Sequence, residues 1–200
     1  KGVAKRMYKV DSLDEVTTDM RRSAKAINFG ILYGMGVQAL GRGLGVKQAE
    51  AQEFYLAYYS TFAGLSEYLK NCKIEAERNG FTSTLFYRRR YFQDIRSNIP
   101  FIKAAAERMA INAPIQGTDA DMVKMAMVKI DQWITDRGLQ DKVHMIAQVH
   151  DELLFEIDNT DEAFVEKTLK EIQEMMENIL VNFPLMRTLE NIPEVPFKVG

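Results

Sequence analysis

The chain has 200 residues, of which 46% are hydrophobic and 27% are charged, so it has the length and composition of a folded globular protein and not of a disordered one. Its formal net charge of −2 gives no support to a broadly basic nucleic-acid-binding protein, although contacts to phosphate need only a local basic surface. A single cysteine excludes an intrachain disulfide and a multi-cysteine metal site, and no apolar run has the length of a membrane span.

The first part of the chain follows mainly helical patterns. Thr17 and Thr18 can cap a following helix, which ends in a stretch punctuated by glycines from Gly34 to Gly45. Pro114 is expected to separate two further helices. The helices are predicted over a short segment within 1–20 and over about 19–33, 47–78 with a break near 62–64, 101–113, 118–136 and 161–182.

The pattern changes from a period of 3.6 to a period of 2 at residues 143–149 and 153–157, which indicates two strands separated by the polar turn His150-Asp151-Glu152. Residues 81–92, after the turn signal Asn79-Gly80, are predicted to form a hairpin-like or irregular segment. A last edge strand is expected at 195–199. The fold class is therefore α+β. The final helix is expected to place these apolar residues on one side: Phe164, Leu169, Ile172, Met176 and Ile179.

A basic and aromatic stripe follows the helix over about 19–33. Its members recur every four residues and so share one helical face: Arg21, Lys25, Phe29 and Tyr33. The opposite side carries Ala24, Ile27 and Ile31 and is the better candidate for burial. Two cations followed by rings suit a triphosphate joined to a flat base. Gly30 and Gly34 allow close approach of another backbone or a base. The alternative is a solvated basic face with two rings packed on a neighbour.

The predicted hairpin turn holds a carboxylate, Asp151, between two apolar strands. Mg²⁺ prefers hard oxygen ligands, and a phosphoryl-transfer enzyme holds two such ions about 4 Å apart. Carboxylates are also ordinary in turns that have only a structural role.

Long polar side chains occur near Pro114 at a spacing of four: Arg108, Asn112 and Gln116. Minor-groove acceptors lie in similar places for every correct base pair, so such donors could test pair geometry without reading sequence. A capping or surface role is the alternative. Upstream, residues 84–96 are rich in arginine and carry Arg88, Arg89 and Arg90, which are candidate phosphate ligands.

Several strings of this sequence resemble motifs of the family A DNA polymerases. They are RRSAKAINFGILYG (21–34), TLFYRRRYFQDI (84–95), AAAERMAINAPIQGTDADMVKMAM (104–127) and QVHDELLFEI (148–157). The resemblance implies a helical fingers subdomain over 1–103 and the C-terminal half of a palm over 104–200, in which an antiparallel hairpin is flanked by helices.

The resemblance also implies a role for each candidate residue. Arg21 and Lys25 bind the phosphates of the incoming dNTP, Phe29 packs on its sugar and base, and Tyr33 guards the templating position. Lys25 stabilises the pyrophosphate leaving group. In the palm, Asp151 is a metal ligand for Mg²⁺, Glu152 supports it, and His150 contacts the primer terminus. Primer–template DNA is contacted by these residues: Arg88, Arg89, Arg90, Arg108, Asn112 and Gln116.

The expected function is template-directed DNA synthesis in replication or repair, by two-metal nucleotidyl transfer in a monomeric enzyme of the bacterial cytoplasm or nucleoid. The expected rivals are a single-subunit RNA polymerase and a non-catalytic DNA-binding relic. We find no Asp-x-Ser-x-x-Glu motif for a second metal-binding carboxylate, so the chain is expected to be part of a longer protein and inactive alone. It departs from the family at Tyr87, in place of a glycine, and at Gln93, in place of a proline. A tyrosine at a position suited to positive φ is strained.

Overall fold

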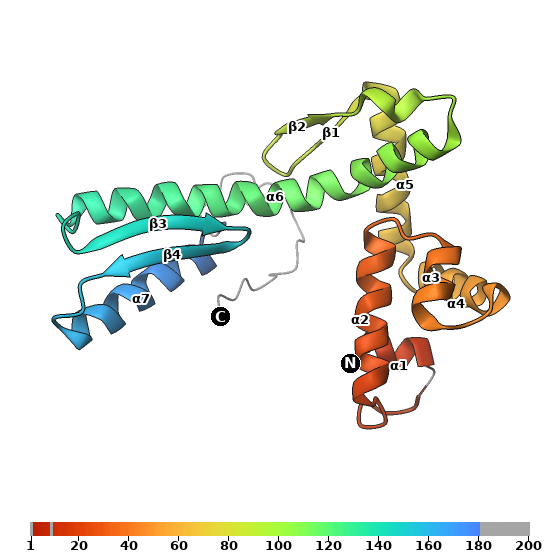
Figure 1. Cartoon of the computed structure of the whole chain (residues 1–200), viewed down its shortest axis with the longest axis horizontal. Helices are drawn as coiled ribbons and strands as arrows, with labels where there is room; N and C mark the ends of the chain where they lie inside the picture. Colours follow the sequence, from red (N-terminus) through yellow and green to blue (C-terminus); the bar gives the residue numbers. More distant parts are fainter. Residues whose placement is uncertain (1, 9, 181–200) are drawn as a thin grey trace. The chain divides into compact units, whose positions relative to one another are not determined.

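The computed structural model describes residues 2–8 and 10–180 (Figure 1). The chain divides into two compact units between Ile115 and Gln116. Helices dominate the described residues, and the strands form two antiparallel pairs, β1 with β2 and β3 with β4. The predicted α+β fold is therefore confirmed. No helix in the described ranges combines the length and the apolar character that crossing a membrane would require.

The first unit begins with helices that pack around aromatic and branched side chains. Their bounds are α1 Gly2–Tyr8, α2 Thr18–Leu32, α3 Val37–Leu44, α4 Gln48–Thr61 and α5 Ala63–Asn79. Thr17 caps α2, since its hydroxyl accepts a hydrogen bond from the Met20 N–H at 3.2 Å. The predicted buried face is confirmed, because Ala24, Ile27 and Ile31 are each no more than 3% exposed.

Helix α2 is held in place by α3 and α4. Ile27 and Ile31 share a core cluster with Leu40 and Tyr58. The Tyr58 hydroxyl donates a hydrogen bond to the Asn28 side-chain oxygen at 2.5 Å, and burial raises the pKa of this phenol. These contacts fix which face of α2 is turned outward.

The glycine-punctuated stretch contains a helix, α3, where the sequence pattern predicted none. Two of its glycines serve packing and termination. Gly41 is buried, and a Cβ there would lie 3.2 Å from the Cβ of Ala51 on α4. Gly45 ends the helix with a φ of 67°. Gly41 therefore allows α3 to pack closely on α4, and the helix forms in spite of its glycines.

The predicted break near 62–64 is confirmed at Phe62, which separates α4 from α5. The Asn79-Gly80 turn is also confirmed, since Gly80 ends α5 with a φ of 78°. The chain then forms the predicted hairpin. Strand β1, Phe81–Ser83, pairs antiparallel with β2, Arg89–Tyr91, and the 3-10 helix η1, Gln93–Arg96, follows.

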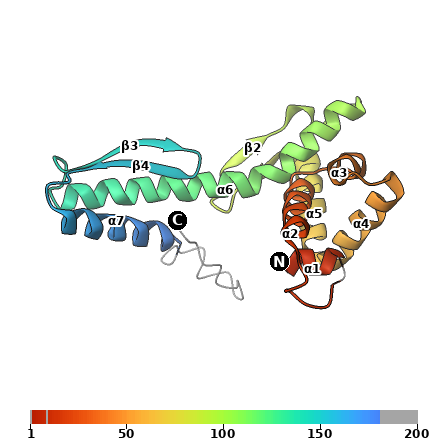
Figure 2. The same cartoon turned by 60° about the horizontal axis from the view of Figure 1, so that its bottom comes forward.

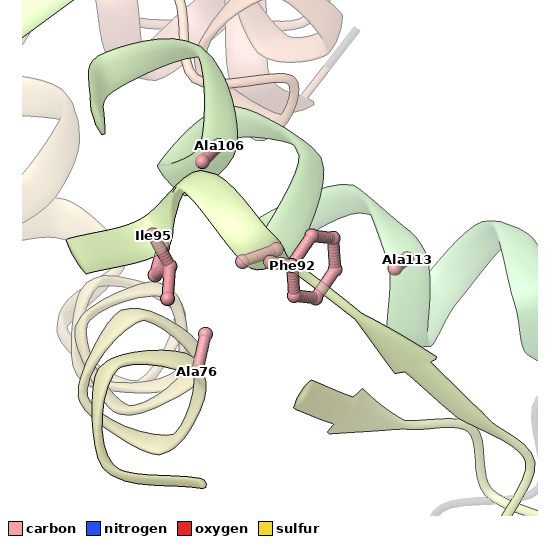
Figure 3. Close-up of a cluster of buried hydrophobic side chains, with 6 residues drawn as sticks. Ala76, Phe92, Ile95, Ala106 and Ala113 are labelled. Carbon is pink, nitrogen blue, oxygen red and sulfur yellow. The ribbon is translucent and has the colours of Figure 1, made fainter. Parts of the chain in front are cut away.

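Residues from η1 and its flanks fill the space between α5 and α6. Figure 3 shows Ile95 pointing toward Ala76 of α5 and the Phe92 ring lying toward Ala113 of α6. Ile95 is 1% exposed and Ala76 is fully buried. This cluster packs the β1–β2 hairpin and its arginines onto the first part of α6.

One continuous helix, α6, runs over Pro100–Asp136 and includes Pro114, so the two predicted helices over 101–113 and 118–136 were wrong. Pro114 has no N–H to donate to the carbonyl of Ala110, which is the usual reason for a break. The Thr82 hydroxyl of β1 donates to that carbonyl instead, at 3.4 Å, from a side chain only 1% exposed. A partner from outside the helix thus replaces the missing donor.

The second unit packs a hairpin against two helices (Figure 2). Strand β3, Val143–Val149, pairs antiparallel with β4, Glu152–Ile157, and helix α7 spans Glu162–Glu177. The apolar core joins Ile130 of α6, Val143 of β3 and Ile172 of α7. The predicted antiparallel hairpin flanked by helices is therefore confirmed.

Three predictions for this unit need correction. Glu152 is the first residue of β4, so the turn consists of His150 and Asp151 alone. Leu169 is 51% exposed, because five residues after Phe164 a side chain has moved about 140° around the helix axis. Helix α7 ends at Glu177, before the predicted position. The predicted strand at 195–199 lies outside the described residues.

Candidate functional site

The predicted stripe on α2 is exposed along its length. Arg21 and Lys25 face solvent, and Phe29 and Tyr33 are 44% and 45% exposed. The Lys25 ammonium lies 5.8 Å from the centroid of the Phe29 ring, and the Phe29 and Tyr33 rings stack at 6.2 Å with an interplanar angle of 18°. One cation and two nearly parallel rings therefore form a continuous outward surface.

This surface carries two cations, Arg21 and Lys25. Within the described part of the chain, no carboxylate forms an ion pair with Arg21 or Lys25. An anionic ligand would therefore not have to displace a resident acidic partner. A guanidinium offers a planar fork for phosphate oxygens, and an ammonium offers a compact charge with three donors.

The two glycines at the end of α2, Gly30 and Gly34, are each approached by a side chain of this chain. A Cβ on Gly30 would lie 2.5 Å from the Met35 methyl carbon. Gly34 has a φ of 76°, and a Cβ there would lie 2.7 Å from Cγ of Arg108. The structure thus brings Arg108, predicted as a DNA contact, to the residue that follows Tyr33.

The arginines of the β1–β2 hairpin are exposed, and two of them are oriented by neighbouring groups. The Arg89 guanidinium lies 4.6 Å from the centroid of the Phe81 ring. The Arg90 guanidinium lies 5.8 Å from the Phe92 ring centroid and donates to Met109 Sδ at 3.9 Å. Arg90 therefore lies beside the residue that follows Arg108 on α6.

Arg96 has a different position from the other arginines of the segment. Its Nε and one terminal nitrogen donate to the carbonyls of Glu77 and Arg78, both at 2.9 Å. These carbonyls belong to the last turn of α5, where helix acceptors lack intrahelical donors. Arg96 caps a helix with both ends of its guanidinium.

The two positions at which the segment departs from the expected pattern keep an ordered backbone. Tyr87 has a φ of 64°, so the expected positive φ is present with a tyrosine in place. Its N–H donates to the Thr84 carbonyl at 3.0 Å. Gln93 is the first residue of η1, a position in which a proline would also be compatible because the N–H has no intrahelical acceptor.

All three candidate minor-groove residues belong to α6. Arg108 is exposed, Asn112 is half-buried and Gln116 is exposed. Because α6 does not break at Pro114, Gln116 continues the same helix, four residues after Asn112.

The acidic turn of the second unit is narrow. His150 has a φ of 57°, and the Gln148 side-chain amide donates to its carbonyl at 2.9 Å. Asp151 and Glu152 are both exposed. The described residues contain no group of three or more His, Cys, Asp and Glu side chains placed to hold a metal ion. Asp151 and Glu152 supply hard oxygen donors that suit Mg²⁺, and such an ion would need further ligands.

Comparison with known proteins decides the family. The family model for DNA polymerase family A matches residues 1–199. The chain belongs to DNA polymerase family A. DNA polymerase I of Pseudomonas aeruginosa is 44% identical over 164 residues, or 82% of this chain and 17% of that protein. DNA polymerase I of Rhizobium leguminosarum is 43% identical over 160 residues, or 80% of this chain and 16% of that protein.

A solved structure agrees with the family. It is the POL domain of Pol1 from M. smegmatis in complex with DNA primer-template and dNTP, with a TM-score of 0.78 and 39% sequence identity. The match covers 88% of this chain and 30% of that chain. This family A chain spans about a sixth of the length of the relatives named above.

The structural roles of two residues that position the arginine-rich residues 84–96 of this family A chain were not predicted from the sequence. Thr82 supplies the hydroxyl that supports α6 at Pro114, and Arg96 caps α5. Pro114 signals that the Ala110 carbonyl needs another donor, but no local pattern indicates that the donor comes from Thr82. Arg96 could be recognised only once its distance from the end of α5 is known.

Proposed function

We propose that this chain forms the nucleotide-binding and part of the catalytic region of a DNA polymerase that adds deoxynucleotides from dNTPs to a primer 3′-hydroxyl. The observation that carries the proposal is the outward stripe on α2, in which the Lys25 ammonium lies 5.8 Å from the Phe29 ring and that ring stacks on Tyr33. A triphosphate joined to a flat base matches this order of charge and rings.

In the proposed complex, Arg21 and Lys25 bind the triphosphate, and Lys25 stabilises and protonates the departing pyrophosphate. Phe29 packs on the sugar and base, and Tyr33 guards the templating position. The unpaired charge of Arg21 and Lys25 within the described ranges supports these roles. Catalysis then depends mainly on positioning and charge stabilisation.

Asp151 is proposed as a ligand of Mg²⁺, with Glu152 in support and His150 at the primer terminus. The exposure of both carboxylates at the tight β3–β4 turn supports this role. When bound, two Mg²⁺ ions would lower the pKa of the attacking hydroxyl and neutralise the triphosphate. Asp151 and the α2 stripe are proposed to serve the same reaction in the complete enzyme.

Duplex contacts are proposed for two groups of residues. Arg88, Arg89 and Arg90 bind phosphates, which is supported by their exposure on the β1–β2 hairpin. Arg108, Asn112 and Gln116 donate to minor-groove acceptors, which is supported by their place on one helix. The partners are therefore primer–template DNA and dNTPs, as in the mycobacterial complex.

The same proposal assigns residues 1–103 to the fingers and 104–200 to the palm. The enzyme is proposed to act as a monomer in the bacterial cytoplasm or nucleoid. A role in replication or repair is proposed because the similar proteins named above are DNA polymerases. Those relatives also favour DNA over RNA as the product.

The test is Lys25→Ala in the complete polymerase, with Lys70→Ala on α5 as a matched loss of an exposed lysine. Single-turnover incorporation should slow by about a hundredfold or more for Lys25→Ala, because a general acid and a charge on the leaving group are lost together. Primer–template affinity and the Lys70→Ala rate should stay within about twofold of the wild type. A near-normal incorporation rate for Lys25→Ala would remove the phosphate role.

A further inference from the structure

Tyr87 occupies a backbone conformation that costs free energy for a tyrosine. Its φ of 64° lies in the left-handed region, which glycine, asparagine and aspartate enter more readily than a residue with a bulky side chain. Its side chain is 73% exposed, so burial of the ring within this unit does not offset the cost. Strain of this kind persists where surrounding structure imposes it, and it often accompanies function.

The backbone around Tyr87 is fixed by Thr84. The Thr84 carbonyl accepts the Tyr87 N–H at 3.0 Å, and the Thr84 N–H donates to the Arg88 carbonyl at 2.9 Å. The Thr84 hydroxyl accepts from the N–H groups of Phe86 and Arg88, both at 3.2 Å. The Tyr87 ring is therefore presented outward from a rigid position.

The groups next to this ring are cationic. Arg88, Arg89 and Arg90 follow it directly and are exposed, and the Arg89 guanidinium is oriented by the Phe81 ring at 4.6 Å. These arginines can bind a polyanion, and the exposed ring beside them can pack on a flat or apolar group of the same ligand. A DNA strand has this chemistry, since its sugars and bases lie between regularly spaced phosphates.

We propose that Tyr87 is a DNA-contact residue whose ring packs on a sugar or base of the strand whose phosphates the neighbouring arginines bind. The contact is independent of base sequence, because every nucleotide offers a sugar and a flat face. The inference rests on the proposed function and adds a specific contact to it. It also accounts for the tyrosine at a backbone position where glycine would be relaxed.

The test compares Tyr87→Gly, Tyr87→Asn and Tyr87→Phe in the complete polymerase. Glycine and asparagine both accept a positive φ and both remove the ring, so the unfolding temperature should stay at or above that of the wild type. Their affinity for a fluorescent primer–template should fall by about fivefold or more, the usual effect of removing an aromatic stacking partner. Tyr87→Phe keeps the ring and should bind within about twofold of the wild type.

Salt dependence separates the ring from the arginines. Tyr87→Gly should leave the slope of log Kd against log salt unchanged, whereas Arg89→Ala should reduce it by about one. Leu56→Ala is the control, because it removes another exposed apolar side chain. Leu56 belongs to α4, which lies away from the β1–β2 hairpin in the first unit (Figures 1 and 2). This variant should keep the wild-type affinity for primer–template and the wild-type salt slope.

Two outcomes would overturn the inference alone. They are wild-type affinity in Tyr87→Gly and Tyr87→Asn, and a loss in Tyr87→Phe as large as that in Tyr87→Gly, which would assign the contact to the hydroxyl. If the wild-type protein neither bound nor extended a primer–template, both the inference and the proposed function would fall.

Discussion

The Thr82 hydroxyl donates a hydrogen bond to the main-chain carbonyl of Ala110 at 3.4 Å, across 28 positions of sequence. The carbonyl lies four residues before Pro114, which has no N–H to offer it. A buried carbonyl without a donor costs about 1–3 kcal/mol, so this single contact helps to keep α6 continuous. It also connects strand β1 of the β1–β2 hairpin to helix α6, which carries Arg108.

We therefore expect Thr82→Val to destabilise the protein by about 1–2 kcal/mol, because it keeps the shape of the side chain and removes the donor. Pro114→Ala restores an N–H at the position that the helix requires. In the double variant the Ala110 carbonyl regains a partner, so the loss caused by Thr82→Val should be smaller than in the single variant. Denaturant unfolding of all four proteins measures this coupling.

Additive effects in that cycle would show that the two residues do not share an acceptor. Thr82→Ser is the control, since it retains the hydroxyl and should preserve most of the stability.

A second prediction concerns tyrosines whose pKa values are raised in the first unit. Burial raises the pKa of Tyr58, and it raises those of Tyr59 and Tyr68 further, with additional contributions from Tyr55 and Cys72 respectively. The folded state thus favours the protonated phenols more than the unfolded state does. Stability is fully present below the unfolded pKa of about 10 and is lost as the pH rises above it.

Unfolding free energies measured between pH 8 and pH 11.5 should therefore fall above about pH 10. Tyr59→Phe and Tyr68→Phe remove two of the groups and should make that fall shallower. An unchanged dependence on pH in the double variant would contradict the assignment to these phenols.

The arginines of residues 84–96 should separate into two functional classes. Arg96 donates twice to the end of α5, so Arg96→Ala should destabilise the protein by about 1–2 kcal/mol. Lysine cannot reproduce a two-ended guanidinium contact, so Arg96→Lys should restore little of the lost stability. Both substitutions are measured by thermal or denaturant unfolding.

Arg89→Ala provides the matched comparison for Arg96. Because Arg89 is exposed and its guanidinium lies against the face of Phe81, its loss should cost less than about 1 kcal/mol of stability. Its loss should instead reduce the salt dependence of DNA binding. The reverse assignment, with Arg96 controlling DNA affinity and Arg89 controlling stability, would refute this division.

The 200-residue chain by itself is expected not to extend a primer. The described residues hold no group of three acidic or imidazole side chains placed for a metal ion, and the sequence has no Asp-x-Ser-x-x-Glu motif. Incubation with primer–template, dNTPs and Mg²⁺ should leave the primer unchanged on a denaturing gel. Extension that disappears with Asp151→Asn would show that this chain supplies a complete site.

Local chemistry made much of the fold predictable. Thr17 caps α2 through its own neighbours, Gly80 ends α5 through its own φ, and the buried residues of α2 follow the helical period. Each of these features depends on a few adjacent residues. The outward stripe on α2 was predictable for the same reason, since burial of one face leaves the other for solvent and ligands.

The features of the fold that the sequence did not predict involve contacts between residues far apart in the chain. Thr82 supports α6 from 28 positions away in the sequence, and Gly41 of α3 packs against Ala51 of α4. The site shows the same limit. The order of Lys25, Phe29 and Tyr33 could be read from spacing, but the position of Arg108 against Gly34 follows only from the packing of the first unit.

The surroundings of Gly34 limit which substitutions this position can accept during evolution. Its φ of 76° disfavours most side chains, and the Arg108 stem occupies the volume that any side chain would need. Position 34 is therefore restricted in two ways, by its positive φ and by the Arg108 side chain. A smaller residue at position 108 would remove only the second restriction. By contrast, a Cβ on Gly43 would meet nothing within 4 Å. Among variants that accumulate over many generations, position 43 should diversify while position 34 stays invariant.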